Sequence, residues 1–370
     1  MMVVILIVAV LCLAFANGAN DNFKGVATLF GSGTMSYRRA LSWATVSTML
    51  GSLTAVFLAQ VLLESFTGQG LVEGRLVASI DYASAVTLGA GLTVLLATLV
   101  GMPVSTTHSL VGALIGSGLA AGSLINSGNL VTGFFAPLLL SPLLAVGVTF
   151  LLYPMFRWTR GRFGITSETC LCLGNQTLEV VPSSGSTGVV LRAEELSIQV
   201  GDVVTCRSRY AGRMFGFEAG RALDSLHSLS AGLVCFARGL NDTPKIAALL
   251  LLAPAVGKSG SAALVGFSIA LGGVVCARRV AETMSRKITS MTPGQGLTAN
   301  LVTGLIVIGA SQYALPVSTT HVSCGALFGL GAATGQGHWQ VIRRILGAWL
   351  VTLPLGAVTG AVCYLLLRLV

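Results

Sequence analysis

Charged residues are scarce in this sequence: they make up 9% of the chain, whereas 54% of its residues are hydrophobic. Soluble domains carry about 25% charged residues, which cover the water-facing surface. A chain with so few charges cannot cover such a surface, which excludes a soluble globular protein and indicates a polytopic membrane protein. The 46 glycines agree with this class, because small residues let helices approach closely within a bilayer.

Acidic residues are the scarcer charge: the chain has 13 of them against 22 basic residues, a formal net charge of +9. The basic residues form short clusters between apolar runs rather than one basic face or tail, so we expect no nucleic-acid partner. Most of the 8 cysteines lie inside apolar runs, as small buried side chains do. Cys170, Cys172 and Cys206 match no zinc spacing. We therefore expect no metal centre and no cofactor.

The chain contains two copies of one unit. Residues 18–24 read GANDNFK and residues 239–245 read GLNDTPK, and the hexapeptide PVSTTH occurs at 103–108 and at 316–321. After the hexapeptide the match continues at a constant offset of 213 (316 − 103). The residues paired in this way are Gly112/Gly325, Ala113/Ala326, Leu114/Leu327, Gly116/Gly329, Gly118/Gly331, Ala120/Ala333 and Gly122/Gly335. Chance does not produce such agreement.

Each copy holds about five apolar segments, and some 20 residues are enough to span a bilayer. The segments are 2–17, 40–63, 83–101, 104–124 and 130–156 in the first copy, then 223–238, 244–254 with 260–277, 297–314, 317–335 and 345–367 in the second. An odd number of crossings makes the second copy run upside down. The sequence therefore predicts an all-α polytopic membrane protein, an inverted repeat of about 10–12 transmembrane or re-entrant helices.

The basic clusters predict the orientation, because cytoplasmic loops carry an excess of Lys and Arg. With the N-terminus outside, the clusters that fall inside are Arg38 and Arg39; Arg157, Arg160 and Arg162; Arg278, Arg279, Arg286 and Lys287; and Arg343 and Arg344. The outer loops then hold Glu64, Glu73, Arg75 and Asp81, or are nearly uncharged (122–130). We expect a multi-pass protein of the cytoplasmic (inner) membrane with both termini outside.

One long hydrophilic stretch, about 164–222, separates the two copies. Its alternating runs TLEVVP, GVVLR and LSIQVGDVVTCRSR are bounded by proline and glycine, which is typical of short strands. The sequence thus predicts a first membrane repeat at 1–160, a small cytoplasmic β-rich insert at 161–222 and a second, inverted membrane repeat at 223–370. An elaborated linker is the favoured interpretation of the insert, ahead of a regulatory or docking domain.

The hexapeptide PVSTTH has the features of a broken helix that starts again inside the membrane. Pro103 and Pro316 interrupt the incoming helix, and Ser-Thr-Thr follows as N-cap and first turn. A half-helix N-terminus offers free N–H groups and a positive dipole end, which bind anions. The candidate ligands of a small tetrahedral oxyanion are Ser105, Thr106, Thr107, Ser318, Thr319 and Thr320. A single Ser-Thr pair is more often back-bonded within its helix, but this duplication favours a two-sided clamp.

The duplicated Asn-Asp pair places oxygen atoms at the end of an apolar run. Asn20, Asp21, Asn241 and Asp242 suit a hard cation such as Na⁺, or a carboxylate that takes up a proton. The alternative is a helix cap at an Asn-Asp turn. The repetition favours the functional interpretation.

Other polar side chains lie beside these motifs. Lys24 and Lys245 could neutralise the neighbouring aspartate, contact the anion or extend to the membrane surface. Helix packing is favoured for His108 and His321 over a proton relay. Arg238 precedes the second Asn-Asp pair and could contact the anion, but it has no counterpart in the first copy, where the position is an asparagine.

GAND after the first apolar segment, its return as GLND, and the two PVSTTH elements resemble the inorganic phosphate transporter (PiT) family. The resemblance covers most of the chain outside 164–222. It implies a symporter that takes up inorganic phosphate with Na⁺ or H⁺, a homodimer in the lipid bilayer, and an anion held between inverted repeats. It also implies that the Asn, Asp, Ser and Thr residues of the two motif pairs surround the anion and the coupling cation.

The chain departs from the family pattern at two positions. Where the family often has Asp-Val-Ala-Asn, this chain reads Asp-Asn-Phe-Lys at 21–24 and Asp-Thr-Pro-Lys at 242–245. Lys24 and Lys245 therefore put Na⁺ coordination in question and are candidates for anion contact or charge balance. Some proteins that resemble this family carry sulfate, so a sulfate permease is the alternative.

Two further alternatives come from other classes. An anion channel could use the same helix ends, but it needs no coupling acid such as Asp21 or Asp242. An intramembrane enzyme could use Ser105 or Ser318 as nucleophile with the histidine three residues on as base. Hydrolysis needs one such site, whereas this chain has two opposed copies, so we expect a protein that is not an enzyme.

Overall fold

The computed structural model describes residues 1–58, 67–175, 196–202, 215–253, 257–313 and 315–369. The chain divides into two compact units. The membrane unit comprises Met1–Tyr153 and His227–Val370, and the insert unit comprises Pro154–Leu226.

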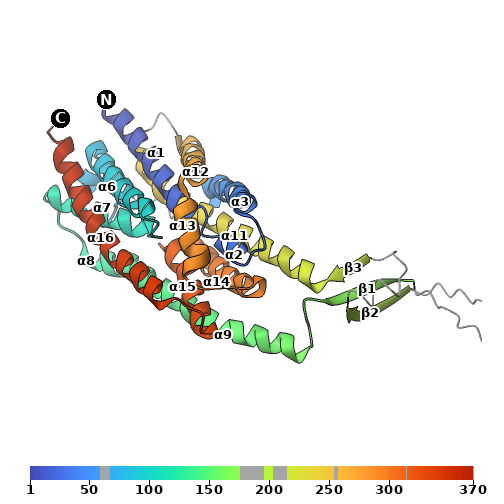
Figure 1. Ribbon diagram of the computed structural model, residues 1–370. Coiled ribbons are helices and arrows are strands. Elements are labelled where there is room, and N and C mark those ends of the chain that lie inside the picture. The colour runs from blue at the N-terminus through green and yellow to red at the C-terminus, as the bar shows by residue number, and fades with distance from the viewer. Residues whose placement is uncertain (59–66, 176–195, 203–214, 254–256, 314, 370) are drawn as a thin grey trace, which may run out of the picture. The chain divides into compact units, whose positions relative to one another are not determined.

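Where the structure describes the membrane unit, its regular elements are helices, apart from two isolated β-bridges (Figure 1). Its first copy contains α1 (Met2–Asp21), α2 (Ala27–Gly31), α3 (Tyr37–Leu58), α5 (Gly74–Val77), α6 (Ile80–Leu99), α7 (Thr106–Ala120), α8 (Ser127–Asn129), the π-helix η1 (Leu130–Phe135) and most of α9 (Ala136–Arg162). Its second copy contains most of α11 (Ala219–Ala247), then η2 (Ala248–Leu252), α12 (Gly257–Cys276), α13 (Arg278–Glu282), η4 (Thr283–Lys287), α14 (Pro293–Gln312), α15 (Thr319–Thr334) and α16 (Trp339–Leu367).

Among the described residues, 5 helices are long and apolar enough to cross a membrane, or 6 with a bent pair counted as one span. The five are Met2–Asp21, Ile80–Leu99, Ser127–Arg162, Pro293–Gln312 and Trp339–Leu367, and the pair, bent by 69°, is Gly260–Cys276 with Arg278–Lys287. The predicted helical membrane fold is confirmed. Helices α7 and α15, with 15 and 16 residues, are too short to cross a hydrocarbon core of about 30 Å at about 1.5 Å per residue. Their length is that of re-entrant half-helices.

Both hexapeptides start a helix in the same way. Ser105 (φ −96°, ψ 115°) accepts a hydrogen bond from the backbone N–H of His108 at 3.1 Å. Ser318 (φ −94°, ψ 113°) accepts one from the N–H of His321 at 3.2 Å. The predicted N-caps are therefore present, and α7 and α15 begin at Thr106 and Thr319.

One boundary differs from the sequence-based prediction. The apolar segments 223–238 and 244–254 were predicted as separate, but α11 continues from Ala219 to Ala247 and contains Pro244. The Asn-Asp pair does not end this helix: within α11, Asn241 accepts a hydrogen bond from Ser311 of α14 and Asp242 accepts one from Thr319 of α15. In the first copy, by contrast, α1 ends at Asp21.

The two copies exchange packing partners. Helix α7 packs against α16, and a Cβ at Gly112 or Gly116 would meet the backbone of that helix. The equivalent Gly325 and Gly329 of α15 approach the backbone of α9. Each half-helix therefore lies against the last long helix of the other copy, as expected for a pseudo-twofold arrangement.

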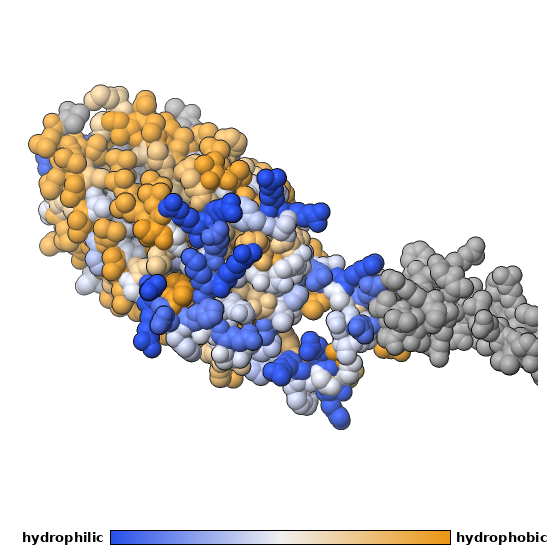
Figure 2. Space-filling view, viewed as in Figure 1, coloured by the Kyte–Doolittle hydropathy of each residue, from blue (hydrophilic) through white to orange (hydrophobic). Residues whose placement is uncertain are grey.

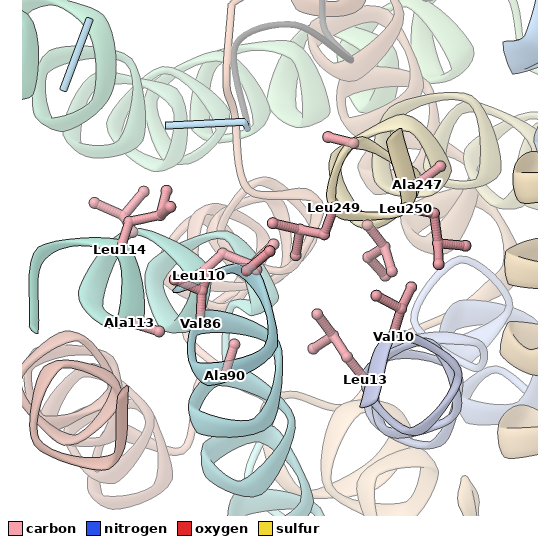
Figure 3. Close-up of a cluster of buried hydrophobic side chains, with 14 of the residues drawn as sticks. Val10, Leu13, Val86, Ala90, Leu110, Ala113, Leu114, Ala247, Leu249 and Leu250 are labelled. Atoms are coloured by element: carbon pink, nitrogen blue, oxygen red, sulfur yellow. The ribbon is translucent and has the colours of Figure 1, made fainter. Parts of the chain in front are cut away.

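Two apolar clusters support the half-helices. In Figure 3, Leu110 and Leu114 of α7 lie with Val86 of α6, Val10 of α1 and Leu249 of η2, all buried. The second cluster contains Leu327, the equivalent of Leu114, with side chains from α14 and α16. Each half-helix is thus buried in a cluster of its own.

The surface of the membrane unit is divided between two kinds of side chain. Figure 2 shows hydrophobic side chains over the end that carries both chain termini, and hydrophilic side chains gathered on the part away from the termini. The exposed basic residues of this unit include Arg38, Arg39, Arg278, Arg286 and Lys287.

The insert unit contains a small antiparallel sheet with the strand order β2-β1-β3. Its strands are β1 (Thr169–Asn175), β2 (Leu196–Asp202) and β3 (Phe215–Glu218). Strand β2 falls within a predicted strand run, whereas β1 contains the Cys-Leu-Cys sequence and had no strand prediction. The runs at 177–182 and 188–192, and Cys206, lie outside the described residues.

Candidate functional site

Both Asn-Asp pairs are fully inside the membrane unit. Asn20 and Asp21 at the end of α1 are each 1% exposed, and Asn241 and Asp242 within α11 are 0% and 4% exposed. A buried carboxylate is costly unless it is paired. The partners of these aspartates therefore define the site.

Lys24 is the partner of Asp21, and its ammonium group is enclosed by oxygen atoms. Its Nζ forms an ion pair with Asp21 and donates to Oδ1 of Asn20 at 2.9 Å. It also donates to the backbone carbonyl of Val104 at 3.0 Å and to Oγ1 of Thr320 at 2.5 Å. Lys24 is 4% exposed, so it does not extend to the membrane surface.

Lys245 repeats this arrangement in the second copy. Its Nζ lies 3.7 Å from Oδ1 of Asp242, and it donates to the carbonyl of Val317 at 2.7 Å and to Oγ1 of Thr107 at 3.1 Å. Val317 is the equivalent of Val104. Each lysine therefore contacts the valine carbonyl of its own copy and the second threonine of the other copy.

Asn17 connects the two aspartates. Its Nδ2 donates to Oγ1 of Thr106 at 3.0 Å and lies 3.4 Å from both Oδ2 of Asp21 and Oδ2 of Asp242. Thr319, the equivalent of Thr106, donates from Oγ1 to the same Asp242 oxygen at 3.4 Å. The first threonines of both hydroxyl runs thus face the aspartate pair.

Arg238 completes the cluster from α11. Its Nη2 donates to Oδ1 of Asn17 at 2.9 Å, and its Nε lies 3.5 Å from Oδ2 of Asp242. Its Nη1 donates to Oδ1 of Asn22 at 3.1 Å. The guanidinium is 1% exposed in a wholly buried setting, where charge-assisted hydrogen bonds are strong.

The asparagines of the motif hold the helix breaks in place. Asn20 donates to Oγ1 of Thr98 at 2.9 Å and accepts from the N–H of Val104 at 3.1 Å. Asn241 accepts from Oγ of Ser311 at 3.5 Å and donates to the carbonyl of Val317 at 3.4 Å. Both amides therefore fix the segment that leads into a half-helix.

In each Ser-Thr-Thr run, the serine caps a helix and the two threonines contact the charged cluster. Ser105 and Ser318 use their hydroxyls as N-caps, which is the structural alternative to anion contact. Thr106, Thr107 and their equivalents contact the charged cluster. The first N–H groups of a helix have no acceptor within it, so these threonines also bring backbone donors to the site.

The histidines pack rather than line the charged cluster. The rings of His108 and His321 lie 4.4 Å apart, and the His321 ring stacks on Trp349 at 3.8 Å between centroids. Trp349 donates from Nε1 to the carbonyl of Pro103 at 3.0 Å. The contact between Ser105 and His108 uses the backbone N–H of the histidine, whereas a nucleophile activated by a base needs the ring.

Sequence reasoning missed several members of the site. Asn17 was noted only as the position that lacks an arginine, and Thr98, Ser311 and the Val104 carbonyl were not considered. The repeat contained a usable signal, because Thr98 and Ser311 share the offset of 213 (311 − 98). Among the described residues, no group of three or more His, Cys, Asp and Glu side chains could hold a metal ion.

Comparisons with known proteins agree on one family. A family profile described as the phosphate transporter family matches residues 17–360. The chain is 28% identical over 424 residues to the chloroplastic inorganic phosphate transporter 2-1 of Arabidopsis thaliana, with 95% of this chain and 70% of that protein covered. It is 26% identical over 407 residues to a protein of Pyrococcus abyssi named as a phosphate permease, with 97% and 96% covered. A solved structure of a sodium-dependent phosphate transporter has the same fold, with a TM-score of 0.76, 23% identity, and 100% and 99% of the two chains covered.

Proposed function

Because the chain belongs to the phosphate transporter family, we propose that it is a secondary active transporter that moves inorganic phosphate across the membrane, driven by an ion gradient. The observation that carries the proposal is the meeting of two half-helix N-termini with three buried cationic side chains. These come from both copies of the repeat.

The chemistry of this centre suits a small oxyanion. Thr106, Thr107, Thr319 and Thr320 supply hydroxyls, and the first N–H groups of α7 and α15 supply donors and positive dipole ends. Arg238, Lys24 and Lys245 supply positive charge. Phosphate offers oxygen acceptors on all sides, so it can accept hydrogen bonds from both copies at once. In this proposal Asp21 and Asp242 form ion pairs with these cationic side chains. Asn20 and Asn241 fix the segments that lead into the half-helices.

The buried position of the centre favours a carrier over a channel. Asp21 and Arg238 are each 1% exposed, so an anion cannot reach them without a change of conformation. A pseudo-twofold pair of repeats provides such a change, because each copy can rock against the other around a fixed site. Coupling to an inward Na⁺ or H⁺ gradient makes this movement accumulate the anion.

We further propose that both termini lie outside and that the insert, about 161–222, lies in the cytoplasm of a cell whose inner membrane holds the protein. Arg38, Arg278 and Arg286 come together around one pocket with Phe30 and Tyr37. A convergence of basic loops on one face is what the positive-inside rule requires.

The loops assigned to the outside also lie together. The N–H of Glu73 donates to Oγ of Ser123 at 3.1 Å, and the N–H of Asn126 donates to the carbonyl of Leu71 at 3.0 Å. These contacts join the loop after 66 to the nearly uncharged loop at 122–130. None of the residues that line the basic pocket comes from these weakly charged loops, in keeping with the proposed orientation.

A homodimer in the lipid bilayer belongs to the same proposal. Helices α9 and α16 carry exposed apolar side chains, among them Leu143, Leu151, Leu350 and Val358. Such side chains are stable only against lipid or another apolar surface.

The boundaries that we propose for the two repeats, 1–160 and 223–370, are those predicted from the sequence.

Uptake into proteoliposomes tests the function. Liposomes with the purified protein should accumulate radiolabelled phosphate saturably under an imposed ion gradient, and protein-free liposomes should not. Saturable uptake of labelled sulfate that phosphate does not inhibit would assign the site to sulfate instead. Non-saturable flux that follows the membrane potential alone would contradict a carrier.

A further inference from the structure

The oxygen atoms around Lys24 form a set that would otherwise suit a metal cation. A carboxylate from Asp21, an amide oxygen from Asn20, a backbone carbonyl from Val104 and a hydroxyl from Thr320 all contact one Nζ. Hard cations take such mixtures of carboxylate, carbonyl and hydroxyl oxygens. In this protein the centre of the set is a covalently attached ammonium group.

The same substitution is present in the second copy. The Nζ of Lys245 contacts a carboxylate oxygen of Asp242, the carbonyl of Val317 and the hydroxyl of Thr107. The carboxylate, carbonyl and hydroxyl oxygens of the two sets are equivalent under the repeat, and both sets are filled by a lysine. A chance surface lysine would not recur in this way at 2–4% exposure.

We propose that Lys24 and Lys245 are tethered replacements for two coupling cations, so that this protein binds and moves its anion without bound Na⁺. The inference rests on the proposed function and concerns its driving ion. The proton gradient then remains as the driving force, because a tethered ammonium group never leaves the protein and contributes no gradient of its own.

The charges of the site support this proposal. Among the described residues, the buried Asp, Glu, Lys and Arg side chains are Asp21, Asp242, Lys24, Lys245 and Arg238, which sum to +1. One monovalent anion makes the loaded site neutral. Without the two lysines the sum would be −1, and two monovalent cations would be needed to reach neutrality with the same anion. The lysines thus replace two cations in number as well as in position.

The ammonium groups also exclude a competing cation. A Na⁺ ion could enter either oxygen set only by displacing an Nζ, and the displaced lysine would then be buried without its acceptors. An unpaired buried charge is far more costly than a paired one. The energy needed to displace the lysine therefore opposes Na⁺ binding at both places.

Binding of ²²Na⁺ to the purified full-length protein tests the inference without any anion. The wild type should show no saturable ²²Na⁺ binding, whereas Lys24→Gln and Lys245→Gln should each gain it. Lys287→Gln is the matched control, because it removes the same charge from an exposed lysine outside the site; it should behave like the wild type. Saturable binding to the wild type would overturn the inference, as would its absence from both site variants when they elute as monodisperse protein.

Uptake of labelled phosphate gives a second readout. The initial rate in the wild type should be the same with Na⁺ as with N-methyl-D-glucamine, and should rise with an inward proton gradient. In a variant that combines Lys24→Gln with Lys245→Gln, the uptake rate with Na⁺ should exceed the rate with N-methyl-D-glucamine more than tenfold. A wild-type rate that collapses without Na⁺ would overturn the inference. Absence of uptake under every gradient would reject phosphate transport, and the ²²Na⁺ result would still decide the role of the lysines.

Discussion

Arg238 donates a hydrogen bond to Asn17 at 2.9 Å, although the two residues occupy equivalent positions in the two copies of the repeat. The offset is the one that relates the Asn-Asp pairs (238 − 17 = 221, as 241 − 20 = 221). The pseudo-twofold axis therefore passes between them. This is where the otherwise symmetric site is asymmetric: the second copy supplies the positive charge and the first supplies its acceptor.

Exchanging these two residues tests whether the arginine must come from the second copy of the repeat. Arg238→Asn should lower phosphate affinity at least about tenfold, because it removes a buried cation beside Asp242. The exchange Asn17→Arg with Arg238→Asn restores the charge and the pair on the opposite copy. We expect it to recover most of the affinity in an equilibrium binding assay. A double variant no better than Arg238→Asn would show that the guanidinium is needed specifically on α11.

The first threonines of the half-helices should contribute directly to anion binding. Thr106→Val and Thr319→Val keep the shape of the side chain and remove a hydroxyl at the charged cluster. Loss of a hydrogen bond to a charged group costs about 1.5–3 kcal/mol, which is more than tenfold in affinity. Thr303→Val is the control, since this buried threonine donates within its own helix, to the carbonyl of Ala299 at 2.8 Å. Unchanged affinity in both site variants would show that the Ser-Thr-Thr runs only begin the two helices and do not bind the anion.

The orientation can be checked by labelling. In a background without native cysteines, single cysteines at Arg39, Arg160 and Lys287 should be protected from an impermeant reagent added to intact cells. A cysteine at Arg75, whose side chain is 74% exposed, should react. Reaction at Lys287 together with protection at Arg75 would reverse the proposed orientation.

The stability of the protein should depend on the close approach of α7 and α16. A Cβ at Gly116 would overlap the backbone carbonyl of Ala357, and overpacking of this kind typically costs about 1–3 kcal/mol. Gly116→Ala should therefore lower the thermal midpoint in detergent. Gly309→Ala serves as the comparison, because nothing lies within 4 Å of its added methyl group and alanine favours a helix. Equal midpoints would mean that the two helices can move apart at little cost.

Much of the site could be predicted from the repeat alone. The duplicated Asn-Asp and Ser-Thr-Thr elements predict a site shared by the two copies, and in the structure Thr320 and Thr107 each contact the lysine of the other copy. The start of α7 also followed from local chemistry, because Pro103 breaks a helix and Ser105 caps one. The helix break and the helix cap each depend on a few neighbouring residues, so the local sequence is enough to predict them.

The direction of Lys24 could not be predicted in this way. One helical turn beyond Asp21, its side chain could extend to the surface or turn inward, and the local sequence favours neither. Its inward position depends on the carbonyl of Val104 and the hydroxyl of Thr320, which are distant in sequence. The local sequence also does not explain why α1 ends at its Asn-Asp pair whereas α11 continues through the equivalent pair.

The crosswise packing of the half-helices has a consequence for how the protein is made. Helix α7 lies against α16, which comes much later in the chain, and α16 also supplies Trp349 to the break at Pro103. Chains are inserted from the N-terminus onward at about 5–20 residues per second. Helix α7 therefore has neither this packing partner nor the Trp349 hydrogen bond until α16 has been synthesised. A chain that stops before α16 lacks both supports of its first half-helix.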